Sequence, residues 1–299
     1  MKSTQGIKKS FLVLLTAFWS VTAVTAMANQ EDSRIMVSDV GFETPESVEY
    51  YAAEDLYLVT NINGSPFEES NNGFISKLSP DGKVIDLKWI DGANDKVTLH
   101  APKGMTIIGN KLFVADITQV QVFELPSGKQ LSSINVEGSS FLNGITPGNG
   151  DSVYVTDSGM KPGFESSGTD AIYKVWENGQ VETILKDPNM GSPNGIVNDN
   201  GDIYVVFFNT AKMIKMDDKG NVTEMPKPYG SKLDGLVVLK DGSLAMSSWE
   251  SSSIEVYKDG DYETIAEFLN SPADMDVDTK RNRLLIPLFN ENKVLILPL

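Results

Sequence analysis

The chain has 299 residues, of which 41 are acidic and 25 are Lys or Arg, giving a formal net charge of −16. A surface this acidic repels nucleic acid and anionic membranes and attracts cations, so we expect neither of the first two as a partner. The chain contains no cysteine, which excludes disulfide bonds, a lipid-modified cysteine and a cysteine nucleophile.

Residues 1–28 have the pattern of a cleavable secretory signal peptide. Three lysines precede an apolar run at 11–15, and the segment closes on Ala26-Met27-Ala28, a small-x-small exit typical of signal peptidase sites. The alternative is an uncleaved membrane anchor, because 11–28 is nearly long enough to span a bilayer. Its threonines and serine weaken that alternative. We expect export to the periplasm or beyond, cleavage after Ala28 and a mature domain at 29–299.

Residues 34–40 alternate like a strand and precede a series of six repeats. Each repeat has a Pro- or Leu-initiated turn, an apolar run, a polar tip and a second apolar run. We call the residue after that Pro or Leu the channel position of its repeat. The six channel positions are Glu46, Lys103, Asn143, Asn194, Asp234 and Ala273. They recur at intervals of 57, 40, 51, 40 and 39 residues. Repeats of roughly 40 residues with four strands each are typical of a β-propeller.

The ends of the chain indicate how the ring closes. The last repeat supplies only three strands, at 275–277, 284–288 and 294–297. We predict that the strand at 34–40 completes this sixth sheet, because closure removes exposed sheet edges. Turns such as Glu177-Asn178-Gly179 join the third and fourth strands of the repeats, and no long helical period occurs. The sequence therefore predicts an all-β chain folded as a six-bladed β-propeller.

Two repeats carry insertions, at 61–73 and 157–169, between their second and third strands. Both are rich in Gly, Ser, Asn or Pro, so they are expected to be loops. In an up-and-down sheet they would overhang the same end of the channel as the channel positions. We expect them to form a rim around a pocket, with tolerated surface length as the alternative.

Four of the six channel positions carry side-chain oxygens that could converge on the axis. Glu46 and Asp234 supply carboxylates, and Asn143 and Asn194 supply amides. Such hard donors suit Ca²⁺ better than a softer metal. In the alternative, the pairs Asn143-Gly144, Asn194-Gly195 and Asp234-Gly235 are kept only for turn geometry.

The motifs Pro45-Glu46, Asn143-Gly144, Pro193-Asn194-Gly195 and Asp234-Gly235 resemble the ligand stations of the regucalcin/gluconolactonase family. The resemblance runs from about Val40 to Leu299 and favours the exported bacterial members. It implies a six-bladed propeller related to paraoxonases and diisopropyl fluorophosphatase. It also implies a divalent cation, usually calcium, bound by Glu46, Asn194 and Asp234, with Asn143 as a further ligand or a substrate contact.

Two features depart from this family. Lys103 stands near the place of the paraoxonase-like base histidine, and Ser47-Val48 follows the glutamate instead of a Pro-containing motif. The only histidine, His100, lies in the turn before Lys103, where a surface role is the simpler interpretation. No Ser-His-acid triad and no Gly-rich phosphate loop is evident.

We weigh two functions. The first is a calcium-dependent hydrolase of a small lactone or ester, in which Asp234 activates water or attacks directly, and Lys103 orients the substrate with Asn143 and Asp274. The metal ligands would be Glu46, Asn143, Asn194 and Asp234. The second is a non-catalytic periplasmic propeller that binds a small ligand or a protein partner at the same channel mouth.

Overall fold

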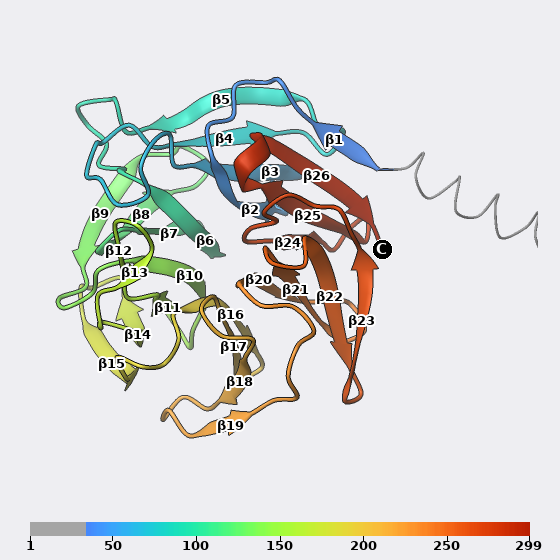
Figure 1. Ribbon diagram of the computed structural model, residues 1–299. Helices are drawn as coiled ribbons and strands as arrows, with labels where there is room; N and C mark the ends of the chain where they lie inside the picture. Colours follow the sequence, from blue (N-terminus) through green and yellow to red (C-terminus); the bar gives the residue numbers. More distant parts are fainter. Residues whose placement is uncertain (1–33) are drawn as a thin grey trace, which may run out of the picture.

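The computed structural model describes residues 34–299, so the predicted signal peptide and its cleavage site lie outside the described residues. Within 34–299 the chain forms six four-stranded antiparallel sheets arranged in a ring, together with one two-stranded hairpin (Figure 1). The predicted all-β, six-bladed propeller is therefore confirmed. The single helical element of this region is the 3₁₀ turn η1 (Phe289–Glu291). None of the described residues forms a helix long and apolar enough to cross a membrane.

Each blade is a consecutive run of strands, numbered from the channel outward. Blades 1 to 3 consist of β2 (Pro45–Tyr51), β3 (Leu56–Asn61), β4 (Phe74–Leu78) and β5 (Val84–Asp91); β6 (Pro102–Ile108), β7 (Lys111–Asp116), β8 (Gln119–Glu124) and β9 (Gln130–Asn135); and β10 (Leu142–Pro147), β11 (Ser152–Asp157), β14 (Ala171–Trp176) and β15 (Val181–Lys186). Blades 4 to 6 consist of β16 (Pro193–Asp199), β17 (Asp202–Phe207), β18 (Met213–Met216) and β19 (Val222–Glu224); β20 (Leu233–Val238), β21 (Leu244–Ser248), β22 (Ser253–Lys258) and β23 (Asp261–Ala266); and β24 (Asp276–Asp278), β25 (Arg283–Leu288), β26 (Lys293–Pro298) and β1 (Ile35–Val37).

Blade 6 is completed by the N-terminal strand, as predicted. β1 pairs antiparallel with β26, with Ile35 opposite Ile296 and Val37 opposite Val294. The blue and red strands lie side by side in Figure 1. Because β26 is now an inner strand of the sheet, its backbone groups pair on both sides, and the sheet edges that an open ring would expose are absent from this junction.

The second strand of each blade is largely buried on both faces because each blade packs between two neighbours. In β7, Leu112 and Val114 join a buried cluster shared with blade 1, whereas Phe113 and Ala115 join one shared with blade 3. Period-2 alternation therefore sends successive side chains to opposite neighbours rather than to core and solvent. The core of the protein is thus divided among the interfaces between blades.

The channel positions lie inside the innermost strands, at irregularities of the strand pairing. In β10 and β16, for example, the register shifts between Leu142 and Ile145 and between Pro193 and Ile196. The glycine after each of four channel positions faces the next blade: a Cβ on Gly195 would lie 2.2 Å from the carbonyl oxygen of Asp234. These pairs therefore lie within the inner strands and not in turns between strands. The glycines are needed because adjacent inner strands approach closely.

The two insertions lie between second and third strands, as predicted. The first connects β3 to β4, and the second contains the short hairpin of β12 (Met160–Lys161) and β13 (Glu165–Ser166), seen in Figure 1 in front of blade 3. Only two residue pairs join β12 and β13. Such a hairpin depends on side-chain packing rather than on its own ladder.

Candidate active site

One cavity gathers side chains from all six blades at the mouth of the channel. Its floor consists of four of the channel positions, and its walls are apolar except for one lysine and one indole. The residues lining it are Glu46, Ile62, Pro66, Lys103, Phe141, Asn143, Met160, Phe164, Asn194, Phe208, Asp234, Trp249 and Phe289. Pro66, Met160 and Phe164 come from the two insertions, so the prediction that these loops form a rim is confirmed.

The four predicted cation ligands share the floor of this cavity. Glu46 lies on β2, Asn143 on β10, Asn194 on β16 and Asp234 on β20, each at the second residue of its strand. Each has at most 5% of its surface exposed. The structure therefore brings together, from four different blades, residues that are far apart in the chain.

Two carboxylate oxygens on the floor are buried without a partner. Among residues 34–299, Glu46 Oε2 and Asp234 Oδ1 have no hydrogen-bond donor. Burial raises the pKa of both carboxyls well above the ordinary range, and the charge of Asp274 raises both further. Since an unpaired buried carboxylate is costly, this floor is arranged for a positive charge or a proton.

The amide of Asn143 is held by a short chain of hydrogen bonds. Its Nδ2 donates to Ser158 Oγ at 3.1 Å, and Ser158 Oγ donates to the carbonyl oxygen of Pro193 at 2.7 Å. With the nitrogen engaged in this way, Asn143 Oδ1 remains available as an acceptor for a group in the cavity. Ser158 was not among the predicted site residues, and it fixes the orientation of one of them.

Lys103 is a buried cation in the cavity wall. Its Nζ donates to the carbonyl oxygens of Ala101 at 3.0 Å and Pro66 at 3.3 Å, and it lies 4.2 Å from the centre of the Phe141 ring. Burial lowers the pKa of Lys103 to about 8, with Asp116 and Glu46 acting in the opposite direction. An ammonium has three N–H donors, so one remains for a group in the cavity.

Trp249 presents a second donor. Its Nε1 is buried and has no hydrogen-bond acceptor in the described part of the chain. The indole and the amide of Asn194 lower the pKa of Asp234 against the larger effect of burial. The indole N–H therefore lies close to the Asp234 carboxylate, although no hydrogen bond joins the two atoms in residues 34–299, and it can donate to a ligand in the cavity.

Three other residues from the sequence analysis lie away from the cavity. Asp274 is not among the residues that line it; its Oδ2 accepts a hydrogen bond from Ser47 Oγ, and its pKa is raised to about 7, mainly by burial. His100 also lies outside the lining, and its Nδ1 accepts a hydrogen bond from the backbone N–H of Asn71. Ala273, the sixth channel position, is buried and apolar.

Sequence reasoning missed most of the apolar wall. The rings of Phe67, Phe141, Phe164, Phe208, Trp249 and Phe289, which we call the aromatic collar, form a continuous series with centroids 4.9 to 6.5 Å apart. A signal for part of it was present. The residue that directly follows the second strand of each blade is, in order, Ile62, Ile117, Ser158, Phe208, Trp249 and Phe289. This second repeating position follows nearly the same spacing as the channel positions.

The floor fits a hard divalent cation. Two carboxylates and two amides supply oxygen ligands, and the partnerless oxygens of Glu46 and Asp234 are the kind of atoms such an ion would satisfy. In residues 34–299 no group of three or more His, Cys, Asp or Glu side chains is arranged to hold a metal. This is consistent with a site in which half of the donors are amides.

Comparison with solved structures places the fold. A gluconolactonase of Xanthomonas campestris matches with a TM-score of 0.68 and 15% identity over 91% of this chain and 92% of its own. The chain has the fold of the gluconolactonase-like six-bladed propellers. A protein provisionally assigned as a gluconolactonase matches with a TM-score of 0.69 and 15% identity, covering 89% of this chain and 91% of that one.

The same fold also carries a different chemistry. A streptogramin B lyase matches with a TM-score of 0.63 and 13% identity over 88% of this chain and 96% of its own. No protein-family model matches this chain, and no curated protein does. At these identities the likeness describes the gluconolactonase-like propeller fold alone, so the reaction has to be argued from the side chains of the cavity.

Proposed function

We propose that this protein is a calcium-dependent hydrolase of a small lactone or ester. The observation that carries the proposal is the convergence of Glu46, Asn143, Asn194 and Asp234 on one floor, with a partnerless carboxylate oxygen on each of the two acids. These four residues would hold the cation. When bound, calcium supplies a Lewis acid that polarises a carbonyl and stabilises the oxyanion.

The other residues of the site have separate tasks. Asp234, whose Oδ1 is free, would take the proton from the attacking water or attack the carbonyl carbon directly. The free N–H of Lys103 and the Nε1–H of Trp249 would orient the substrate oxygens. Hydrolysis then forms one bond from the water oxygen to the carbonyl carbon and breaks the bond to the leaving oxygen, which takes up a proton.

A panel of lactones and esters tests this function. Purified protein should hydrolyse members of the panel in the presence of calcium, and chelation or Asp234→Asn should abolish turnover. Failure to hydrolyse any member with calcium present would overturn the proposal.

A binding protein is the second candidate, and one observation favours it. No imidazole is among the residues that line the cavity, so the described site lacks the side chain that most often serves as a general base. A binding protein would be stabilised by its ligands without hydrolysing them. We also propose export with cleavage after Ala28, on the pattern of residues 1–28.

A further inference from the structure

We infer that the substrate of this site carries an apolar group, such as an alkyl or aryl chain, rather than the hydroxyl groups of a sugar lactone. This inference rests on the proposed function and adds the class of substrate to it. It follows from the division of the cavity into a polar floor and an apolar wall.

The wall above the floor offers few hydrogen-bond partners. Its side chains are the five rings of the aromatic collar other than Phe67, together with Ile62, Pro66 and Met160, and its side-chain donors are Lys103 Nζ and Trp249 Nε1. Two donors suffice for the oxygens of one ester group. The several hydroxyls of a sugar lactone would be buried against rings without partners, which lowers affinity.

The collar is shaped to enclose a chain. Phe208 lies between Phe164 and Trp249, with ring centroids 6.5 and 5.4 Å away, and Trp249 in turn lies 5.0 Å from Phe289. Trp249 therefore joins the two parts of the site: its ring belongs to the apolar wall and its Nε1 is buried beside the floor. An acyl group whose carbonyl oxygen accepts from Nε1 would place its chain against the neighbouring rings.

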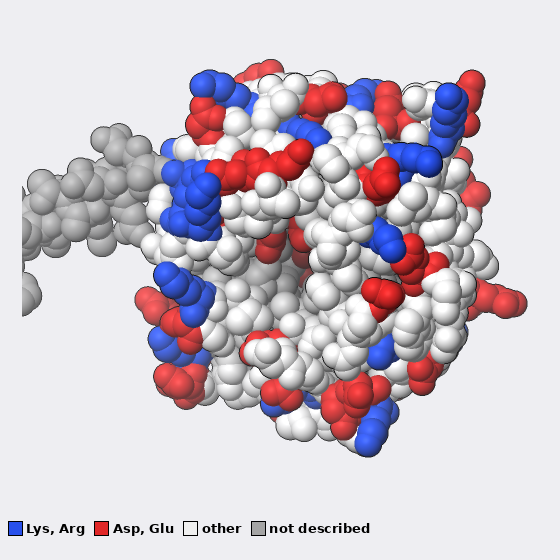
Figure 2. All heavy atoms as spheres, turned by 180° about the vertical axis from the view of Figure 1, so that it is seen from behind, with Lys and Arg blue, Asp and Glu red and all other residues white. Residues whose placement is uncertain are grey.

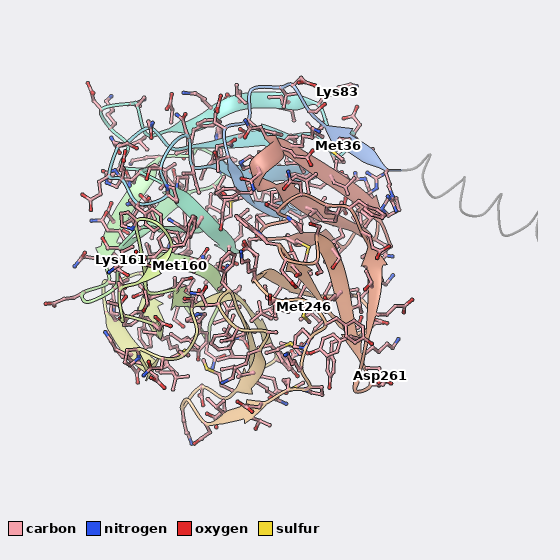
Figure 3. All side chains as sticks on the ribbon, in the orientation of Figure 1. Met36, Lys83, Met160, Lys161, Met246 and Asp261 are labelled. Atoms are coloured by element: carbon pink, nitrogen blue, oxygen red, sulfur yellow. The ribbon has the colours of Figure 1, made fainter. Side chains whose placement is uncertain are left out.

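The cavity has to open for such a ligand. Its volume is ≈ 30 Å³, room for about one or two water molecules and not for a lactone ring. Phe164 is the ring that can yield. It sits at the tip of the β12–β13 hairpin, which two residue pairs hold together, and 45% of its surface is exposed. Figure 3 shows Met160 and Lys161 on β12; Met160 is buried in the cavity wall, and Lys161 is exposed.

The experiment compares γ-lactones whose side chain grows from methyl to hexyl with D-glucono-δ-lactone, in calcium. We expect kcat/KM to rise about threefold to fourfold for each added methylene until the collar is filled. Phe208→Ala should flatten this dependence. Trp249→Phe, which keeps a ring but removes the N–H, should instead lower kcat/KM about tenfold for every chain length. Phe268→Ala, at a residue with 94% of its surface exposed, is the matched control and should change nothing.

Binding of 5-alkyl-2-pyrrolidinones, which resist hydrolysis, is measured by calorimetry on the same proteins. If gluconolactone is hydrolysed best and kcat/KM does not depend on chain length, the inference about the substrate is wrong, whereas the proposed hydrolase function still holds. If pyrrolidinones with longer chains bind more tightly but no lactone is hydrolysed, the aromatic collar binds apolar groups as inferred and the proposed hydrolase function is wrong. If neither turnover nor binding responds to chain length, the inference is wrong.

Discussion

Ser47 Oγ donates a hydrogen bond to Asp274 Oδ2 at 2.9 Å, and this contact joins the first blade to the last. Asp274 N–H also donates to the carbonyl oxygen of Glu46 at 2.9 Å. At the place of Ser47, blades 2 to 5 have Gly104, Gly144, Gly195 and Gly235, each facing the backbone of the next blade. Blade 6 has Asp274 at the corresponding place, so blades 1 and 6 carry side chains where blades 2 to 5 have glycine, and a hydrogen bond joins these two side chains.

This difference predicts unequal costs for similar substitutions. Gly195→Ala would place Cβ 2.2 Å from Asp234 O, so the inner strand has to shift and the floor of the site shifts with it. We expect a loss of unfolding free energy on the order of 3 to 5 kcal/mol. Ser47→Ala removes only a hydrogen bond and should cost about 1 to 2 kcal/mol. Urea denaturation of both variants measures this, and equal costs would contradict the close-approach explanation.

Calcium should stabilise the folded protein through the floor. A ligand that binds only the native state adds about 2.7 kcal/mol at 100 times its Kd. Thermal unfolding with calcium and with chelator should show this shift in the wild type and lose it in Asp234→Asn. Asp218→Asn, which alters an exposed carboxylate on the β18–β19 turn, should keep the shift. Retention of the shift in Asp234→Asn would place the ion elsewhere.

The buried carboxylates predict an unusual pH profile without calcium. Burial raises the pKa of Asp274 to about 7 and that of Asp276 to about 6, from a usual value near 4. The folded state then binds more protons than the unfolded state between pH 4 and 7, so stability should fall as pH rises through this window. Urea midpoints in chelator measure it, and Asp274→Asn should make the fall shallower.

Lys103 predicts a second part of the pH dependence of stability, the upper limb, in which stability changes with pH in the opposite direction. Its pKa of about 8 is below the usual value for lysine, so between pH 8 and about 10.5 the unfolded state binds more protons. Lys103 should therefore make stability rise with pH in this range. Lys103→Met should flatten the upper limb alone. An upper limb that persists in this variant would show that another group causes it.

Lys103→Met should also separate calcium binding from turnover. The ammonium repels a divalent cation on the floor: at ~8 Å and an effective dielectric constant of 20, each charge product costs about 2 kcal/mol. Its removal should tighten calcium binding about tenfold or more, measured by titration calorimetry. The same change removes a substrate donor and should lower kcat/KM about tenfold or more. A change of both quantities in the same direction would contradict the assigned role.

The export proposal has its own test. If residues 1–28 are cleaved, the intact mass of the protein recovered from the periplasm should be that of a chain beginning at Asn29. The formal net charge of this chain is −19, because the removed residues carry three lysines and no acid. A mass that retains residues 1–28 would contradict cleavage.

Figure 2 shows that basic and acidic side chains are interspersed over the face opposite to that of Figure 1. This face is hollowed near its centre, and acidic side chains are visible in the hollow.

The fold and the floor of the site could be predicted because both repeat along the chain. Turn, strand and glycine recur around Asn143, Asn194 and Asp234, so their common location follows from the ring itself. The aromatic collar escaped prediction because its repeating position changes in size and polarity, from Ile62 to Phe208 and Trp249. The irregular pairing of the inner strands was not predicted, because turn geometry was the alternative weighed for these pairs, whereas close approach of the backbones of adjacent blades is what requires their glycines. The chemistry of the site does not follow from the repeats, because it depends on the few side chains that differ between them.

The pairing of β1 with β26 makes the two ends of the domain partners in a single sheet. During synthesis, β1 can join its sheet only after β26 has been made, so the hydrogen bonding of the ring is completed by the two ends of the domain together. The floor of the cavity draws on blades on both sides of this junction. The alignment of Glu46 with Asp234 therefore depends on both ends of the domain, and a chain shortened at either end should lose this alignment before it loses most of its sheets.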